Sequence, residues 1–193
     1  MHRIYVTNGI VLSKRGVGEA NTLVSILTEE FGLVRAKATS TRVEGSKLRY
    51  GLETLSKGRY SFVQGRYEWK LTGCEQVSHE LVGILKESRV ASGRIIKLLL
   101  RLIHGEEEGK ALFATVSEGL AHLAGATSAV AVSSIECILV LRILSHLGYL
   151  PQTLALEPFV EGDFESAQAA IGAQASRTFL IRTINESLMQ TGL

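Results

Sequence analysis

In the first 78 residues, apolar side chains recur at every second position, which is the period of a β-strand. Ile4, Val6, Ile10 and Leu12 share one parity, and they predict a long first strand. Further strands are expected at 22–28, 33–40, 53–63 and 66–77, with turns at 15–19, 30–32 and 64–65. Five short strands at this spacing predict a small closed barrel. An OB-like barrel is one solution, and the pattern alone does not separate it from an SH3-like barrel.

After Ser78 the apolar period becomes that of an α-helix. Asp163 and Ser176 are expected to cap two helices, and Gly148 followed by Pro151 is expected to end another. The helices are predicted at 81–103, 110–123, 128–147, 163–170 and 176–189. The predicted fold class is therefore α+β with two domains. A five-stranded barrel, for which an OB-like fold is one solution, is expected over residues 1–80, and an all-α helical domain over residues 81–193.

Positive charge is concentrated between Leu33 and Lys70. This stretch carries nine basic and three acidic residues, hence a net charge of +6, whereas the whole chain is only +2. Cations on strands, together with aromatic rings, are suited to a nucleic-acid surface, because they neutralise phosphates and stack on unpaired bases. The alternative is a solvated sheet face, which the same alternation of basic and apolar residues would produce.

The aromatic residues allow two interpretations. Tyr60, Phe62, Tyr67 and Trp69 stand at strand spacing, which is more typical of barrel core than of a stacking surface. Tyr50 lies in the basic connection between strands and is the better stacking candidate. Among the helices, a basic stripe at i, i+3 and i+7 is more typical of a solvated helix face than of a DNA contact; it consists of Arg94, Lys97 and Arg101.

The sequence offers little for catalysis or metal binding. His79-Glu80 begins like a zinc-protease motif, but Gly83 stands where the second histidine is needed. Cys74 and Cys137 are too far apart in sequence for a close metal-binding pair, so buried reduced thiols are expected. The chain has one aspartate, Asp163, whereas a two-metal nuclease needs several converging carboxylates. We therefore expect no enzymatic activity, no cofactor and no metal.

Two stretches of the chain resemble the bacterial recombination mediator family RecO. The first runs over residues 9–55 and includes Leu27-Thr28-Glu29-Glu30-Phe31-Gly32-Leu33-Val34-Arg35-Ala36-Lys37-Ala38 and Ser46-Lys47-Leu48. The second is Leu141-Arg142-Ile143-Leu144-Ser145-His146-Leu147-Gly148-Tyr149-Leu150-Pro151, which is similar to the family's central helix and its Gly-Tyr-x-Pro end.

This resemblance implies an OB-fold domain, a helical domain and no catalytic turnover. It implies binding of single- and double-stranded DNA, annealing of complementary strands, and binding of the C-terminal tail of the single-strand-binding protein. It also implies action with RecR in loading RecA. The DNA-binding candidates are Lys14, Arg15, Arg35, Lys37, Arg42, Lys47, Arg49 and Tyr50; the candidates for the partner tail are Arg94, Lys97, Arg101 and Arg142.

The chain departs from the family at two places. Thr153-Leu154-Ala155-Leu156-Glu157-Pro158 follows the Gly-Tyr-x-Pro end and contains no cysteine, where many members carry a four-cysteine zinc module. Ala38 replaces the family's glycine. A cytoplasmic, nucleoid-associated protein without a membrane partner is expected, because the first residues enter a strand pattern with no signal-peptide core. The rival hypothesis is an OB-fold protein–protein adaptor without intrinsic DNA binding.

Overall fold

The computed structural model describes residues 3–39, 41, 48–105, 109–171 and 174–190. The chain divides into two compact units. We call Met1–Val82 together with Ile103–Ala114 the barrel unit, and Gly83–Leu102 together with Thr115–Leu193 the helical unit. Each unit is described by itself below.

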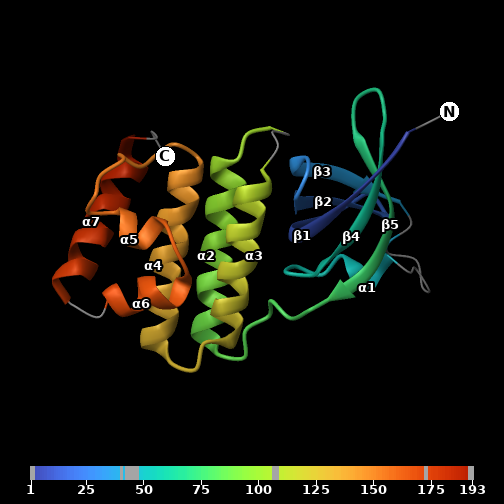
Figure 1. The fold of residues 1–193 in the computed structure, drawn as a ribbon. Coiled ribbons are helices and arrows are strands. Elements are labelled where there is room, and N and C mark those ends of the chain that lie inside the picture. Colours follow the sequence, from blue (N-terminus) through green and yellow to red (C-terminus); the bar gives the residue numbers. More distant parts are fainter. Residues whose placement is uncertain (1–2, 40, 42–47, 106–108, 172–173, 191–193) are drawn as a thin grey trace. The chain divides into compact units, whose positions relative to one another are not determined.

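The barrel unit contains a closed barrel with the strand order β1-β2-β3-β5-β4. Its strands are β1 Ile4–Val17, β2 Asn21–Thr28, β3 Gly32–Ala38, β4 Lys57–Gln64 and β5 Trp69–Ser78 (Figure 1). Neighbouring strands are antiparallel except β3 and β5, which are parallel. The short helix α1, Leu48–Gly51, precedes β4. This topology is OB-like, so the predicted barrel is confirmed and the SH3-like alternative is set aside.

Aromatic side chains fill the barrel interior, as the strand spacing predicted for three of them. Tyr60 and Phe62 are fully buried, and Trp69 is 7% exposed. The Trp69 ring packs edge-on against Phe62 and against Tyr5, with centroids 6.1 and 5.2 Å apart. The buried Tyr60 hydroxyl donates to the Gly51 carbonyl at 2.9 Å, which ties α1 to β4. Burial raises the pKa of Tyr60 well above its usual value.

Tyr67 is the exception, because its side chain is 87% exposed. The prediction that it shares the core face with Trp69 is therefore wrong. β5 begins at Trp69, and residues 65–68 form a four-residue turn that the Gly65 N–H closes by donating to the Glu68 carbonyl at 2.9 Å. The turn takes Tyr67 out of the strand alternation.

Two other strand boundaries also differ from the prediction. β1 continues through Val17, which pairs with Asn21, so the turn expected at 15–19 is shorter. β4 begins at Lys57 rather than near residue 53, because the backbone turns at Leu55, which has φ of 70°. The Leu55 N–H instead donates to the Val11 carbonyl.

A β-bulge in β1 changes which side chains face outward. Val11 pairs with Ile26 and Ser13 with Ser25, so Leu12 is the extra residue between them. Before the bulge, the barrel core is reached by Tyr5 and Val11 rather than by the expected parity. Of the expected set, Ile4 is 63% exposed, whereas Ile10 and Leu12 are buried outside that core cluster. There is little room beside β1, because a Cβ on Gly9 would lie 2.6 Å from the Ile26 side chain.

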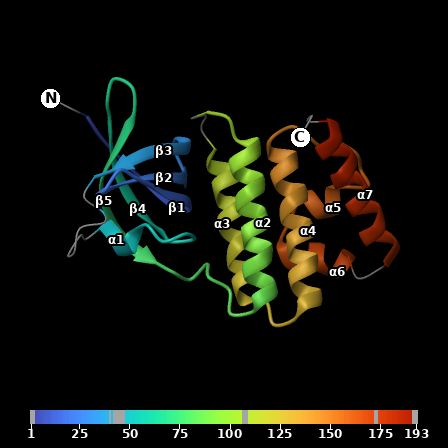
Figure 2. The ribbon, with the colours of Figure 1, turned by 180° about the vertical axis from the view of Figure 1, so that it is seen from behind.

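The helical unit is built around one central helix, α4. α4 packs against α2, α5, α6 and α7, and it lies between α2 and the last three helices in both views (Figures 1 and 2). Ser128 caps its first turn by accepting from the Ala131 N–H at 3.2 Å, and Gly148, with φ of 74°, follows its end. The helices are α2 Lys86–Leu102, α3 Lys110–Gly125, α4 Ala129–His146, α5 Glu157–Val160, α6 Phe164–Ile171 and α7 Gln174–Gln190.

Most helix predictions are confirmed, with three differences. Asp163 caps α6 as expected, because its carboxylate accepts from the Ser166 N–H at 2.7 Å. Ser176 is not a cap, since α7 begins at Gln174. α2 begins at Lys86 rather than near residue 81, and the one-turn helix α5 was not predicted. α4 is long and apolar enough to cross a membrane, but half of it is buried inside the helical unit, as in the core helix of a globular domain.

Both cysteines are reduced thiols. Cys137 is buried, as expected, whereas Cys74 is only half-buried. Burial raises the pKa of Cys137 to about 11, although the nearby Arg177 opposes the shift. At pH 8 we expect iodoacetamide to modify Cys137 roughly a hundredfold more slowly in the folded chain than in urea, because the thiolate is the reactive form. Site-resolved mass spectrometry measures both rates, and equal rates would contradict the burial.

Candidate nucleic-acid interface

Three cationic residues form a row across the outer face of the barrel. Arg15 in β1 pairs with Leu23 in β2, Leu23 pairs with Lys37 in β3, and Lys37 pairs with Lys70 in β5. We call Arg15, Lys37 and Lys70 the cation row. Neighbouring strands are about 4.8 Å apart, so the row spans roughly 14 Å from β1 to β5. The neighbours of Lys37 in β3, Ala36 and Ala38, are fully buried, as expected if Lys37 points out of the barrel.

The cation row is electrostatically unbalanced. Arg15 and Lys70 are exposed and Lys37 is half-buried. Within the described part of the chain none of the three forms an ion pair, and the residue between Arg15 and Lys37 is a leucine. Like charges on paired strands repel one another, and an anion lying across them would relieve the repulsion. The row is therefore suited to bind a polyanion such as a nucleic-acid backbone.

Lys14 and Arg49 lie in a different place from the cation row. After the bulge, Lys14 pairs with the buried Val24, so Lys14 is on the inward-facing side of β1. It lies where the barrel interior opens to the outside. A depression of about 490 Å³ is lined there by Lys14, Gly16, Thr22, Thr41, Arg49, Leu52 and Glu53. The Lys14 Nζ lies 2.6 Å from a Glu53 carboxylate oxygen, so part of its charge is already balanced. This depression is a second, weaker anion-binding candidate.

The remaining DNA-binding candidates are placed as follows. Arg35 is exposed in β3 and pairs with Ser25, one outward position along from Lys37. Tyr50 is 75% exposed on α1. Arg42 and Lys47 lie outside the described residues. Sequence reasoning missed Lys70, because only the parallel pairing of β3 with β5 brings it beside Lys37.

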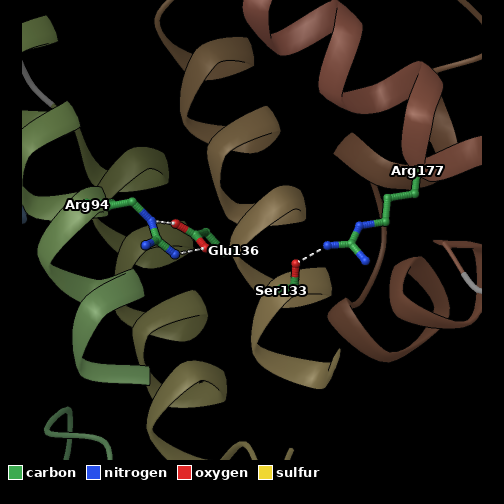
Figure 3. A network of polar contacts seen from close by, with 4 residues as sticks. All are labelled: Arg94, Ser133, Glu136 and Arg177. Atoms are coloured by element: carbon green, nitrogen blue, oxygen red, sulfur yellow. Dashed lines mark hydrogen bonds and ion pairs between the residues drawn. The ribbon is translucent and has the colours of Figure 1, made fainter. Parts of the chain in front are cut away.

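The basic stripe on α2 is partly neutralised. Arg94 forms a bidentate ion pair with Glu136 of α4, with nitrogen–oxygen distances of 2.5 and 2.6 Å (Figure 3). On the other side of α4, Ser133 accepts a hydrogen bond from Arg177 of α7 (Figure 3). Arg94 therefore fastens α2 to α4, while Lys97 and Arg101 remain exposed on the same stripe.

Arg142 is not a surface cation, which corrects the prediction that it contacts a partner. Its side chain is 5% exposed within the helical unit. The guanidinium donates to the carbonyls of Phe159, Gly162 and Asp163 at 3.1, 3.0 and 3.3 Å, and it lies 4.2 Å from the centroid of the Phe164 ring. Burial lowers the pKa of Arg142, and the carboxylates of Glu118 and Asp163 oppose this shift. Arg142 holds the α5–α6 connection against α4.

Comparison with known proteins relates the barrel to one family. Residues 1–79 match the family model described as "Recombination protein O N terminal". The chain is 28% identical over 150 residues to DNA repair protein RecO of Heliobacterium modesticaldum, an alignment that covers 78% of this chain and 54% of that relative. It is 31% identical over 122 residues to DNA repair protein RecO of Gloeothece citriformis, covering 62% of this chain and 43% of that relative. The aligned part is thus about half the length of these relatives.

Proposed function

Since residues 1–79 match the family model described as "Recombination protein O N terminal", we propose that this protein is a DNA-binding protein of recombinational repair that acts without catalytic turnover. The observation that carries the proposal is the cation row on the outside of an OB-like barrel. OB-fold proteins that bind single strands combine a cationic surface along the backbone with aromatic stacking. The row holds phosphates, and it does not read sequence because it makes no contact that depends on the base.

Strand annealing follows from the same chemistry. Two single strands repel each other through their phosphates, and cations that neutralise both backbones remove this barrier. The base edges stay available for pairing because the protein holds the backbones. We propose that the protein anneals complementary strands and binds both single- and double-stranded DNA in this way.

The proposed partners are RecR, the C-terminal tail of the single-strand-binding protein and, indirectly, RecA. Lys97 and Arg101 on α2 are the cationic candidates for an acidic tail, because Arg94 is held by Glu136 and Arg142 is buried. We also propose a cytoplasmic, nucleoid-associated location for the protein.

The proposal predicts a specific loss of DNA affinity when the cation row is reversed. The test variant carries Arg15→Glu, Lys37→Glu and Lys70→Glu. Fluorescence anisotropy with a labelled single-stranded oligonucleotide, across a salt series, measures the dissociation constant. We expect at least about tenfold weaker binding at low salt, and a salt slope shallower by about two, because each lost phosphate contact removes about 0.7 from the slope on single strands.

A charge-matched control separates a local effect from the change in net charge. Lys86→Glu, Lys110→Glu and Arg182→Glu alter the net charge equally at exposed positions that are not part of the row. The control is expected to bind nearly as well as the wild type. Equal losses in the two triple variants would contradict the row as the binding surface. No binding by the wild-type chain, even at low salt, would favour the protein–protein adaptor.

A further inference from the structure

The turn between β4 and β5 presents an exposed aromatic ring that the barrel does not need. Tyr67 is 87% exposed, which makes it, together with Ile84, the most exposed large apolar side chain among the described residues. The turn projects from the barrel strands (Figure 1). An exposed ring at this position contributes little to folding stability, so it is free to contact a ligand without cost to the fold.

The turn is held firmly at its base. Gln64 pairs with Trp69, Trp69 is buried in the core, and the Gly65 N–H donates to the Glu68 carbonyl at 2.9 Å. Few backbone torsions remain for binding to freeze, so the entropy lost when a ligand contacts the turn is small.

The ring already lies beside a cation. The guanidinium carbon of Arg66 is 5.2 Å from the centroid of the Tyr67 ring, within the range of a cation–π contact. Arg66 thus positions the ring on one side and offers a positive charge to a phosphate. An unpaired nucleotide matches these two groups because its base supplies a flat π-face for the ring and its phosphate supplies an anion for the guanidinium.

The turn also continues from the cation row. Lys70, at the β5 end of the row, is three residues beyond Tyr67. At about 3.3 Å per extended residue, the Cα atoms of Tyr67 and Lys70 are therefore at most roughly 10 Å apart, so a strand bound along the row passes close to the turn. We propose that Arg66 and Tyr67 form a stacking site for an unpaired base and make the barrel prefer single-stranded over duplex DNA. The inference rests on the proposed DNA-binding function and adds a site to it.

The test compares a labelled oligothymidine with an abasic oligonucleotide of equal length, which has the same phosphates but no bases. The wild-type chain is expected to bind oligothymidine about tenfold more tightly than the abasic strand. Tyr67→Ala is expected to bring this ratio close to one, with the salt slope and the duplex affinity unchanged. Tyr67→Phe, which keeps the ring, is expected to preserve the ratio.

Two controls make the outcome decisive. Glu68→Gln removes a negative charge from the same turn, so it is expected to tighten binding to both oligonucleotides while leaving their ratio unchanged. In Tyr67→Trp, oligothymidine is expected to quench the new indole fluorescence, whereas the abasic strand is expected to leave it unchanged.

Two outcomes would contradict the proposals. If the wild type and Tyr67→Ala show the same ratio of oligothymidine affinity to abasic-strand affinity, stacking at Tyr67 is refuted while DNA binding stands. If the wild type binds neither oligonucleotide, the proposed function itself fails.

Discussion

Replacing Arg142 by methionine is expected to lower the free energy of unfolding of the helical unit by about 2–6 kcal/mol, because two carbonyls lose their donor. Methionine is apolar and fills much of the same space, but it removes the donor to the carbonyls of Phe159 and Gly162, whereas the Asp163 carbonyl still accepts from the Ala167 N–H. Each buried acceptor that loses its partner costs roughly 1–3 kcal/mol. The contact between the guanidinium and the Phe164 ring is lost as well. A loss of this size would open the α5–α6 connection first.

Urea unfolding followed by far-UV circular dichroism measures this effect, since the signal comes mainly from helices. Arg182→Met is the matched control, because Arg182 is exposed and its only described ion pair is with Glu186, one turn along α7. Exposed pairs of this kind contribute well under about 1 kcal/mol. If the two variants unfold at the same urea concentration, Arg142 is not the structural residue that its contacts indicate.

Replacing Phe62 by alanine is the second large effect, and it concerns the barrel unit. Phe62 is fully buried, and truncation of a buried phenylalanine typically costs about 3–5 kcal/mol because a cavity remains. Trp69 is the only tryptophan in the chain and its ring contacts that of Phe62 edge-on, so its fluorescence reports this part of the core. We expect the midpoint of the fluorescence transition in urea to fall markedly.

Tyr67→Ala provides the comparison for Phe62→Ala. It also removes an aromatic ring, five residues further along the chain, but from an exposed turn. We expect its unfolding free energy to change by no more than about 0.5 kcal/mol. A similar loss in both variants would mean that the Tyr67 ring packs against the protein, and it would weaken the case for an available stacking site.

The barrel and most helices could be predicted from the sequence because their signals are local. The helix end at Gly148 and the cap at Asp163 depend on residues close in sequence. The buried aromatic rings of Tyr60 and Phe62 follow the two-residue period of β4. A boundary set by a long-range contact was not predictable in this way, as at Leu55, whose N–H donates to Val11.

The candidate site was predictable only in part. The charge count over residues 33–70 includes Lys37 and Lys70 but not Arg15, and the grouping of the three depends on strand pairing. The bulge at Leu12 shifts the alternation of β1, so that Arg15 faces outward and Lys14 does not, and the parallel pairing of β3 with β5 brings Lys37 beside Lys70. Arg142 matches a sequence motif, yet a motif does not say whether a cation is buried. The three-dimensional structure was needed to see which cations lie side by side and which one is buried.

The strand order also constrains when the barrel forms. β1 closes the barrel by pairing with β4, and Ile4 meets Val63, which follows 59 positions later in the chain. β3 meets β5 at Ala36 and Trp69, also far apart in sequence. Such non-local contacts form slowly, because a long loop must be ordered before they can stabilise anything. During synthesis on the ribosome, β1 to β3 therefore emerge as an open meander, and the cation row is complete only after β5 has been added.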